Sequence, residues 1–381
     1  MAIVRNTPQD TATVSVTPDQ VRRYRLLRSG LLEPFSSPES ASAELHGIQA
    51  QILPAGALAL WNRTSGLTYA RFEELLYERR TLVKLWGQRG TLHLYASTDW
   101  PLVCSMMTNV KSWWGMAADK EDRYEEYAQL VAQAEQLLRQ RDVLGRSDLR
   151  TSGLPIDTDH LSSWGGLFSD LVRLGYACHA GRLENEGLFA HRTYWLPDLA
   201  WEPPDPDTTN LAVARRYLHA YGPATLQDFT YWLGLKAPPA RRSWRTVEDE
   251  LVPVEVNGVR QYILHEDLAE LTAPAEPARW PVRLLYRFDP LLLAHKEKSW
   301  VVPAAAYKQV WRSAGHIEGI VLAHGQGVAT WRYVRKGRGL VTTVTPFKRL
   351  AKVLTRKIER QAQQVASFFD LPLQSIHFEG S

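Results

Sequence analysis

Residues 82–95 read LVKLWGQRGTLHLY, and they determine the class of fold. Apolar residues alternate on both sides of the four-residue segment 87–90, a pattern that predicts two short strands joined by a tight turn. Three helices are predicted before this hairpin: one that opens with the capping pattern TPDQ at 17–20, one over about 37–46 and one over about 68–80. Three helices followed by a hairpin are the order of a winged helix.

The same order recurs twice along the chain. A long helix over about 123–141 and two shorter helices precede a hairpin that turns at GRLENEG, 181–187. After a proline-rich, acidic linker, WEPPDPDTTN at 201–210, three more helices lead to a hairpin that turns on Asn257-Gly258. We therefore predict three tandem winged helices, at residues 17–115, 120–202 and 208–270.

The last part of the chain, from about residue 275 to 381, has a different character. Three stretches have the composition of strands, and TPFKRLAKVLTRKIERQAQQVASFF at 345–369 reads as a capped amphipathic helix. We expect its buried face to contain Phe347, Leu350, Leu354 and Ile358. This region is predicted to be a β-rich, barrel-like domain that ends in a basic helix, which makes the whole chain an α+β protein.

Basic residues gather near the C-terminus. Residues 331–360 contain ten lysines and arginines and one acid, Glu359, a local charge of +9 in a chain whose total is +4. Such a cluster is typical of proteins with a polyanion partner, nucleic acid above all. The alternative is a solvated helix face beside a basic loop. Tandem winged helices also favour DNA binding, although such modules can bind proteins instead.

Length and composition exclude several classes of protein. A chain of 381 residues with 45% hydrophobic and 23% charged residues is neither a small module nor a disordered protein. No stretch approaches the ~18 apolar residues of a membrane span, and the polar opening does not resemble a signal peptide. We expect a monomeric, cytoplasmic, nucleoid-associated protein without a membrane partner. The chain has only two cysteines and contains neither a P-loop nor an HExxH motif. We therefore expect neither a metal nor a cofactor.

Several stretches, taken in chain order, carry a resemblance to a known family. They are GIQAQILPAGALALWNR (47–63), WGQRGTLHL (86–94), RYLHAYGPATLQDFTYWLGL (216–235), YRFDPLLLAHKEKSW (286–300) and IVLAHGQGVATWRY (320–333). From about residue 20 to 378 the chain resembles the AlkZ/YcaQ family of bacterial winged-helix DNA glycosylases. The resemblance implies three winged helices and a C-terminal barrel-like domain, arranged as a C-shaped scaffold around duplex DNA.

Gln49 and Gln51 are the candidate catalytic residues. Residues two apart share a face only in an extended segment, so one site for both amides requires a non-helical chain. The family motif, Gln, an apolar residue, then Gln or Asp, maps onto Gln49, Ala50 and Gln51. Amides are not general bases, but a purine alkylated at N7 is already an activated leaving group, so amide oxygens need only hold a water and stabilise developing charge. By analogy, Gln51 positions the water and Gln49 assists and steadies the sugar; alternatively, both satisfy backbone groups.

The remaining candidates are DNA-binding residues. Arg89 at the first hairpin tip can enter a minor groove, and Thr91 can donate to phosphate; the alternative for Arg89 is an exposed turn residue. His46 can line the catalytic segment or serve as a backbone partner. Asp289 is expected near the DNA channel or, as the alternative, to act as a turn former before Pro290. The other predicted DNA contacts are Trp86 and His93 in the hairpin, and Lys296, Lys298 and Arg332 as phosphate contacts.

The sequence thus predicts a monofunctional DNA glycosylase. Its reaction is hydrolysis of the N-glycosidic bond of N7-alkylated purines in double-stranded DNA, with unhooking of interstrand crosslinks as a further activity, in DNA repair or self-resistance to a genotoxin. No lysine lies beside Gln49 and Gln51 to form a Schiff base. Two alternatives stay open: a non-enzymatic winged-helix regulator, which has no need of the β-rich domain, and a protein-interaction scaffold, which the +9 window disfavours.

Overall fold

The structure, a computed structural model, describes residues 13–108, 110–162, 165–234 and 237–379. The chain forms two compact units, each built from segments far apart in the sequence. The middle unit comprises residues 35–210 and 365–371; the terminal unit comprises the segments before 35, from 211 to 364 and after 371. Both units contain helices and mostly antiparallel strands, so the predicted α+β class is confirmed. Among the described residues, no helix has the length and apolar character required to cross a bilayer.

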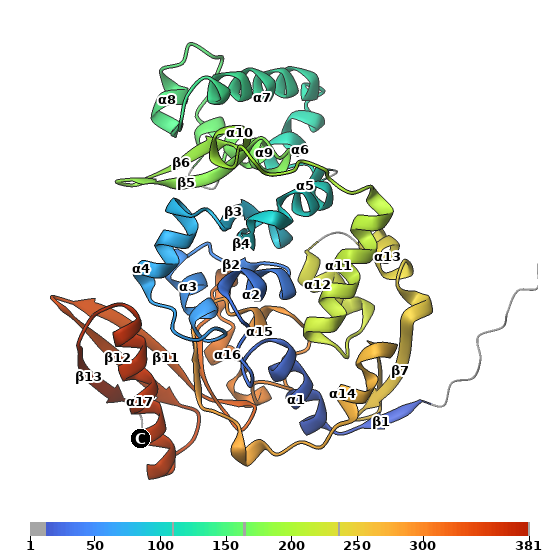
Figure 1. The fold of residues 1–381 in the computed structure, drawn as a ribbon, viewed down its shortest axis with the longest axis vertical. Helices are drawn as coiled ribbons and strands as arrows, with labels where there is room; N and C mark the ends of the chain where they lie inside the picture. Colours follow the sequence, from blue (N-terminus) through green and yellow to red (C-terminus); the bar gives the residue numbers. More distant parts are fainter. Residues whose placement is uncertain (1–12, 109, 163–164, 235–236, 380–381) are drawn as a thin grey trace, which may run out of the picture. The chain divides into compact units, whose positions relative to one another are not determined.

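The hairpin predicted at residues 82–95 is present (Figure 1) and belongs to the middle unit. Its strands β3 and β4 are joined by a 3₁₀ turn, and a two-residue strand, β2, pairs with the other edge of β4. Every residue of β3 and β4 is buried, so the strands belong to the core and only the turn reaches the surface. The bounds are β2 Ile48–Gln49, β3 Leu82–Trp86, the turn Gln88–Gly90 and β4 Leu92–Ala96.

One helix before this hairpin was not predicted from the sequence. Helix α3, Leu53–Trp61, is buried at every position from Ala55 to Leu60. A helix that is apolar on all sides has no periodic pattern to reveal it. Pro54 in its first turn is the remaining sequence signal. The two predicted helices of this region are present as α2 Pro38–Glu44 and as α4 Tyr69–Glu73, which continues as a π-helix over Glu74–Glu78.

The second predicted hairpin and its helices complete the middle unit. Strands β5 and β6 pair antiparallel and turn at Glu184-Asn185. The long predicted helix is α7, which buries Tyr127, Leu130 and Val131 on one face. The core side chains of α7 belong to a cluster that also includes residues of the β3–β4 and β5–β6 hairpins. The bounds are α5 Trp100–Thr108, α6 Trp113–Lys120, α7 Tyr124–Arg139, α8 Arg146–Arg150, α9 Leu167–Arg173, β5 Ala177–Leu183, β6 Glu186–His191 and α10 Arg192–Trp195.

The third predicted hairpin lies in the terminal unit, where it gains an unpredicted strand. β1 pairs parallel with β7, which gives the sheet order β1-β7-β8. Asn257 and Gly258 form the turn with φ of 49° and 77°, as a type I′ turn requires. The predicted linker at 201–210 is half helix, because α11 begins at Pro206. The bounds are β1 Val14–Val16, α1 Pro18–Arg28, α11 Pro206–Tyr221, α12 Leu226–Leu233, α13 Ala237–Arg245, β7 Leu251–Val256, β8 Val259–Leu264 and α14 Leu268–Thr272.

The C-terminal region of the terminal unit contains a five-stranded sheet in the order β13-β12-β11-β10-β9. Strands β9 and β13 do not pair with each other in the described chain, so this sheet is open rather than a closed barrel. The short helices α15 and α16 lie between β9 and β10 in sequence. The bounds are β9 Arg283–Leu285, α15 Pro290–Leu293, α16 Tyr307–Val310, β10 Gly319–Ala323, β11 Gln326–Lys336, β12 Gly339–Pro346 and β13 Leu373–Phe378.

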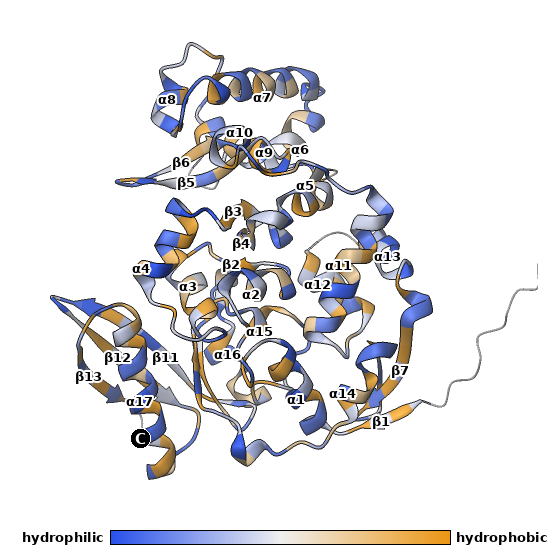
Figure 2. Ribbon diagram, in the orientation of Figure 1, coloured by the Kyte–Doolittle hydropathy of each residue, from blue (hydrophilic) through white to orange (hydrophobic). Residues whose placement is uncertain are grey.

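Helix α17, Lys352–Phe368, is the predicted amphipathic helix, with hydrophobic and hydrophilic residues alternating along it (Figure 2). The prediction placed its start too early: Phe347 and Leu350 precede the helix, because β12 continues to Pro346. Its buried positions are Ile358, Ala362, Val365, Ala366 and Phe368.

The two units cut across the four predicted domains. Helix α1, expected in the first winged helix, belongs to the terminal unit together with the third hairpin and the C-terminal sheet. Three hairpins preceded by helices are present, while the number of winged helices and the C-shaped scaffold stay predictions.

Each unit contains a fully buried histidine, His93 in the middle unit and His295 in the terminal unit. Burial holds the pKa of both well below the ordinary value of 6.5. In the unfolded chain each histidine takes up a proton near pH 6.5, whereas the folded chain does not, so stability is lost as the pH falls. We expect each to cost about 1.4 kcal/mol per pH unit below that point.

Calorimetry between pH 7.5 and 5.5 tests this expectation, since carboxylates contribute only at lower pH. The variant His295→Gln should flatten the pH dependence of the melting temperature. The exposed His324→Asn should not change it. A wild-type melting temperature that is constant over this range would contradict the assignment.

Candidate active site

The chain is not helical at the Gln-Ala-Gln segment, as a shared site for the two amides requires. Gln49 ends strand β2 and pairs with His93, and Gln51 lies in a bend before α3. The backbone N–H of Ala50 donates to the carbonyl of Leu92, 2.7 Å away, which continues the contact with β4. The segment is therefore fixed along the edge of the hairpin.

Packing against α3 explains why the residue between the two glutamines is small. Ala50 is fully buried, and a Cβ added to Gly56 of α3 would lie 2.9 Å from its Cβ. That separation is too short for two carbon atoms, so the chain passes α3 at the closest distance that Ala and Gly allow. The glutamine side chains instead contact residues of the hairpin.

Each glutamine presents its amide oxygen to the hairpin. Arg89 Nη2 donates to Gln49 Oε1 at 3.0 Å, and the backbone N–H of Leu92 donates to Gln51 Oε1 at 3.2 Å. Guanidinium and backbone N–H groups are donors only, so the atom that faces each of them must be the amide oxygen. Gln49 is buried and Gln51 is exposed, which leaves Gln51 the more accessible of the two.

Arg89 also fixes the histidine beside Gln49. Its Nη2 lies 3.1 Å from His93 Nε2, while His93 Nδ1 lies 2.9 Å from the carbonyl oxygen of Thr91. The carbonyl can only accept, so Nδ1 carries the proton and Nε2 accepts from Arg89. Burial, and then the charge of Arg89, hold the pKa of His93 well below its ordinary value. His93 is therefore a neutral, positioned residue at neutral pH.

A buried network holds the turn of the hairpin against the segment. The hydroxyl of Tyr95 donates to Gln88 Oε1, and Gln88 Nε2 donates to the carbonyl oxygen of His46. A Cβ at Gly87 would overlap the Tyr95 hydroxyl, and one at Gly47, where φ is 91°, would overlap the Tyr95 ring. Both glycines are thus required for the close approach of the backbone to Tyr95.

Three of the predicted DNA contacts near the hairpin are buried, and the other two, Arg89 and Thr91, are half-buried and stay predictions. Trp86 is buried and stacks against Phe189, with ring centroids 5.9 Å apart, so it is a core residue. His46 and His93 are also buried in the network around Tyr95. Half-buried Arg89 turns back onto Gln49, with a left-handed φ of 57°. The Thr91 hydroxyl donates to the carbonyl of Gln88.

The predicted phosphate contacts of the terminal unit differ in exposure. Lys298 is buried, and its ammonium group donates to the carbonyl oxygens of Leu292 and His295, so it ties the chain together and is not available to phosphate. Lys296 and Arg332 are exposed. Asp289 is the N-cap of α15 and accepts from the N–H of Leu291, which agrees with the turn former, one of its two predicted roles.

The residues that support the glutamines were not predicted from the sequence. Gln88 and Tyr95 have no distinctive spacing in the sequence. The glycines of the turn, Gly87 and Gly90, are the only sequence signal of close backbone packing there. One group of potential metal ligands occurs in the described chain, His219, Glu266 and Asp267 of the terminal unit. Asp267 is already paired with Arg28 and His219, so this group has a structural explanation.

Comparison with known proteins defines the class. A family model described as DNA glycosylase AlkZ-like matches residues 43–368. The chain therefore belongs to the AlkZ-like DNA glycosylase family, and it is an enzyme of that class. It is similar to the "Interstrand DNA cross-link repair glycosylase" of Streptomyces sahachiroi, with 29% identity over 362 residues, 91% of this chain and 95% of the relative. The solved structure of Streptomyces sahachiroi DNA glycosylase AlkZ matches with a TM-score of 0.79 and 27% identity, covering 96% of this chain and 100% of that one.

Arg89 provides a test of positioning against DNA binding. Lysine keeps the charge but cannot hold two acceptors in one plane, so Arg89→Lys should let Gln49 shift. Because a displacement of about 1 Å can cost 100-fold, we expect single-turnover excision to slow by about 10- to 100-fold with little change in DNA affinity. Arg79→Lys, at an exposed arginine of the same unit, is the matched control. Weaker DNA binding with an unchanged excision rate would instead support the DNA-binding role of Arg89 that was predicted from the sequence.

Gly87 tests the close packing around Tyr95. We expect Gly87→Ala to lower the free energy of unfolding by about 1–3 kcal/mol, the usual cost of overpacking. In a Tyr95→Phe background the closest overlap is absent, so the same substitution should cost less. Gly115→Ala, where a Cβ meets nothing closer than 3.4 Å, serves as the control. Equal costs in both backgrounds, measured by denaturant unfolding, would refute the contact.

Proposed function

We propose that this enzyme is a monofunctional glycosylase that hydrolyses the N-glycosidic bond of N7-alkylated purines in double-stranded DNA, and that interstrand crosslinks are among its substrates. The observation that carries the proposal is the pair of amide side chains, Gln49 and Gln51, whose oxygens are oriented by donors of one hairpin. The crosslink activity is taken from the name of the Streptomyces sahachiroi relative.

The proposed chemistry needs little from the protein. An N7-alkylated purine is positively charged, so its bond to the sugar breaks toward an oxocarbenium-like state without a strong acid. A carbonyl oxygen has two lone pairs, and the hairpin donor uses one of them. In our proposal the second lone pair of Gln51 holds the attacking water, while Gln49 assists and stabilises the developing charge on the sugar.

The arrangement of lysines supports a monofunctional enzyme. A lyase needs an amine, in most cases that of a lysine, to attack the sugar and form a Schiff base. Lys84 is the candidate by environment, because burial, followed by the nearby charge of Arg182, lowers its pKa to about 8. However, Lys84 pairs with Leu94, whereas Gln49 pairs with His93, the next residue of β4. Successive residues of a strand point to opposite faces, so Lys84 lies on the other face from Gln49.

The experiment is single-turnover excision from a duplex that contains one N7-methylguanine, with heat and alkali cleavage to reveal abasic sites. We expect the wild type to release the base and the Gln49→Ala, Gln51→Ala double variant to be slower by about 100-fold or more, the effect of losing preorganised dipoles. Gln133→Ala, an exposed glutamine on α7, is the control. Cleavage of the strand without alkali would show lyase activity and contradict the monofunctional assignment.

A second substrate completes the test. If the wild type releases the methylated base, a duplex with an interstrand crosslink through N7 of guanine should be unhooked by the same enzyme and not by the double variant. Unimpaired excision by the double variant would overturn the catalytic role of both glutamines.

A further inference from the structure

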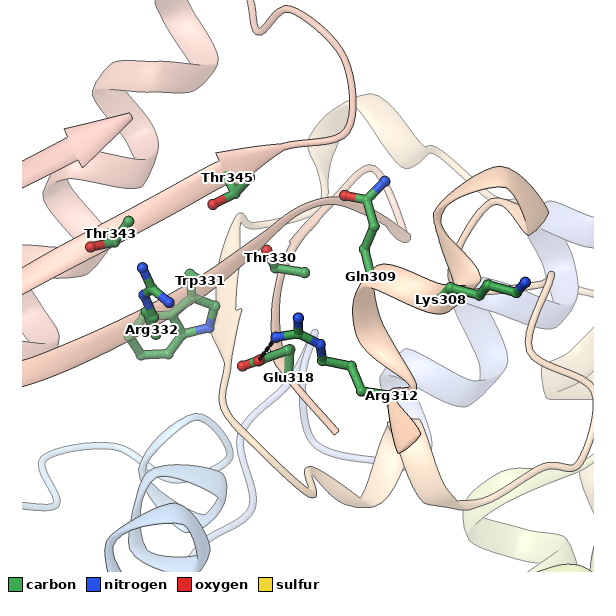
Figure 3. A pocket seen from close by; sticks show the side chains of 9 residues that line it. All are labelled: Lys308, Gln309, Arg312, Glu318, Thr330, Trp331, Arg332, Thr343 and Thr345. Atoms are coloured by element: carbon green, nitrogen blue, oxygen red, sulfur yellow. Dashed lines mark hydrogen bonds and ion pairs between the residues drawn. The ribbon is translucent and has the colours of Figure 1, made fainter. Parts of the chain in front are cut away.

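A cluster of polar side chains lines a hollow of about 290 Å³ on the C-terminal sheet of the terminal unit (Figure 3). Thr330 and Arg332 lie on β11, and Thr345 and Thr343 are their direct partners on β12. Residues two apart on a strand share a face, and so do directly opposite residues. These four side chains, here called the polar square, therefore project from one face of the sheet into the same space.

A second guanidinium borders the hollow from outside the sheet. Arg312 Nη1 lies 3.1 Å from Glu318 Oε1, as drawn in Figure 3. Glu318 also pairs with Arg287 and His316, and it is buried whereas Arg312 is exposed. This one carboxylate is thus surrounded by basic groups, so it anchors Arg312 beside the polar square without making the hollow negative.

An acid of the chain's own C-terminal end contacts the polar square. Glu379 follows β13, and its backbone N–H donates to the carbonyl of Val344 on β12. Its carboxylate lies 3.6 Å from Arg332 Nη2 and accepts from the Thr345 hydroxyl at 3.2 Å. A guanidinium and a hydroxyl are also the groups that bind phosphate oxygens. The carboxylate of Glu379 thus makes the contacts that a phosphate group would make.

We propose that the polar square is a binding site for a phosphodiester group of the DNA backbone, and that Glu379 occupies it until DNA displaces the carboxylate. The inference rests on the proposed function for the identity of the polyanion. Arg332 and Arg312 supply the charge, and the threonine hydroxyls supply neutral donors. The side chains of Arg332 and Glu379 are 56% and 53% exposed, and ion pairs in that environment are weak, so displacement is easy.

The test is a double-mutant cycle on binding to undamaged duplex DNA, measured by fluorescence anisotropy over a range of salt concentrations. Arg332→Gln should weaken binding and lower the salt slope by about 0.9, the contribution of one phosphate contact. Glu379→Gln should tighten binding about threefold at fixed salt, an order-of-magnitude expectation for removing one screened carboxylate. In the Arg332→Gln background the effect of Glu379→Gln should disappear, since its partner is absent.

Matched substitutions separate the site from general electrostatics. Glu359→Gln removes an exposed acid of α17 in the same basic region, and Arg279→Gln removes an exposed arginine outside it. Equal effects of Glu359→Gln and Glu379→Gln, or an effect of Glu379→Gln that persists without Arg332, would overturn the proposal. Because the readout is binding to undamaged DNA, this failure leaves excision of N7-methylguanine intact and so is distinct from failure of the proposed function.

Titration with inorganic phosphate at constant ionic strength distinguishes the source of the phosphate. We expect no Arg332-dependent competition at millimolar concentrations, because a single free phosphate lacks the neighbouring contacts of the duplex. Tight phosphate binding that requires Arg332, without any change in DNA affinity, would assign the hollow to a free phosphate compound and overturn the DNA assignment.

Discussion

The candidate active site depends on two donors that cannot act as acceptors. The guanidinium of Arg89 and the backbone N–H of Leu92 each contact one glutamine, and each therefore selects the amide oxygen rather than the nitrogen. A glutamine side chain is otherwise free to flip its amide. The contacts with the hairpin prevent this flip. Catalysis by oriented dipoles requires that the amides are fixed before the substrate binds.

Contacts around the hairpin hold these donors in place. Both hairpin strands are buried, and the turn is fixed by the Tyr95 hydroxyl through Gln88 to the carbonyl of His46. The same network joins His46, three residues before Gln49, to the turn that contains Arg89. Gly87 and Tyr95 thus support the turn that contains Arg89, although neither residue forms a hydrogen bond with the amides.

Local signals were sufficient to predict much of the fold. The capping pattern of α1, the glycine-bounded turn at 87–90 and Asn257-Gly258 depend on neighbours in sequence, and the structure has all of them. Helix α3 lacked periodicity because it is buried on all sides, and strands β1 and β13 could not be predicted because their parallel partners are far away in the chain. Gln49 and Gln51 were identified by family resemblance, while the inward turn of Arg89 and the burial of Trp86 and Lys298 depend on tertiary contacts that no local pattern encodes.

In our proposal the amide oxygen of Gln51, held by the hairpin, is the group that positions the attacking water. Single-turnover excision of N7-methylguanine by Gln51→Glu and Gln51→Met tests it directly, because both have nearly the size of glutamine but only glutamate keeps an acceptor oxygen. The account predicts that Gln51→Glu stays within about tenfold of the wild type and that Gln51→Met loses about 100-fold or more. Equal loss in both variants would contradict this role, because an acceptor oxygen at position 51 would then not be sufficient for excision.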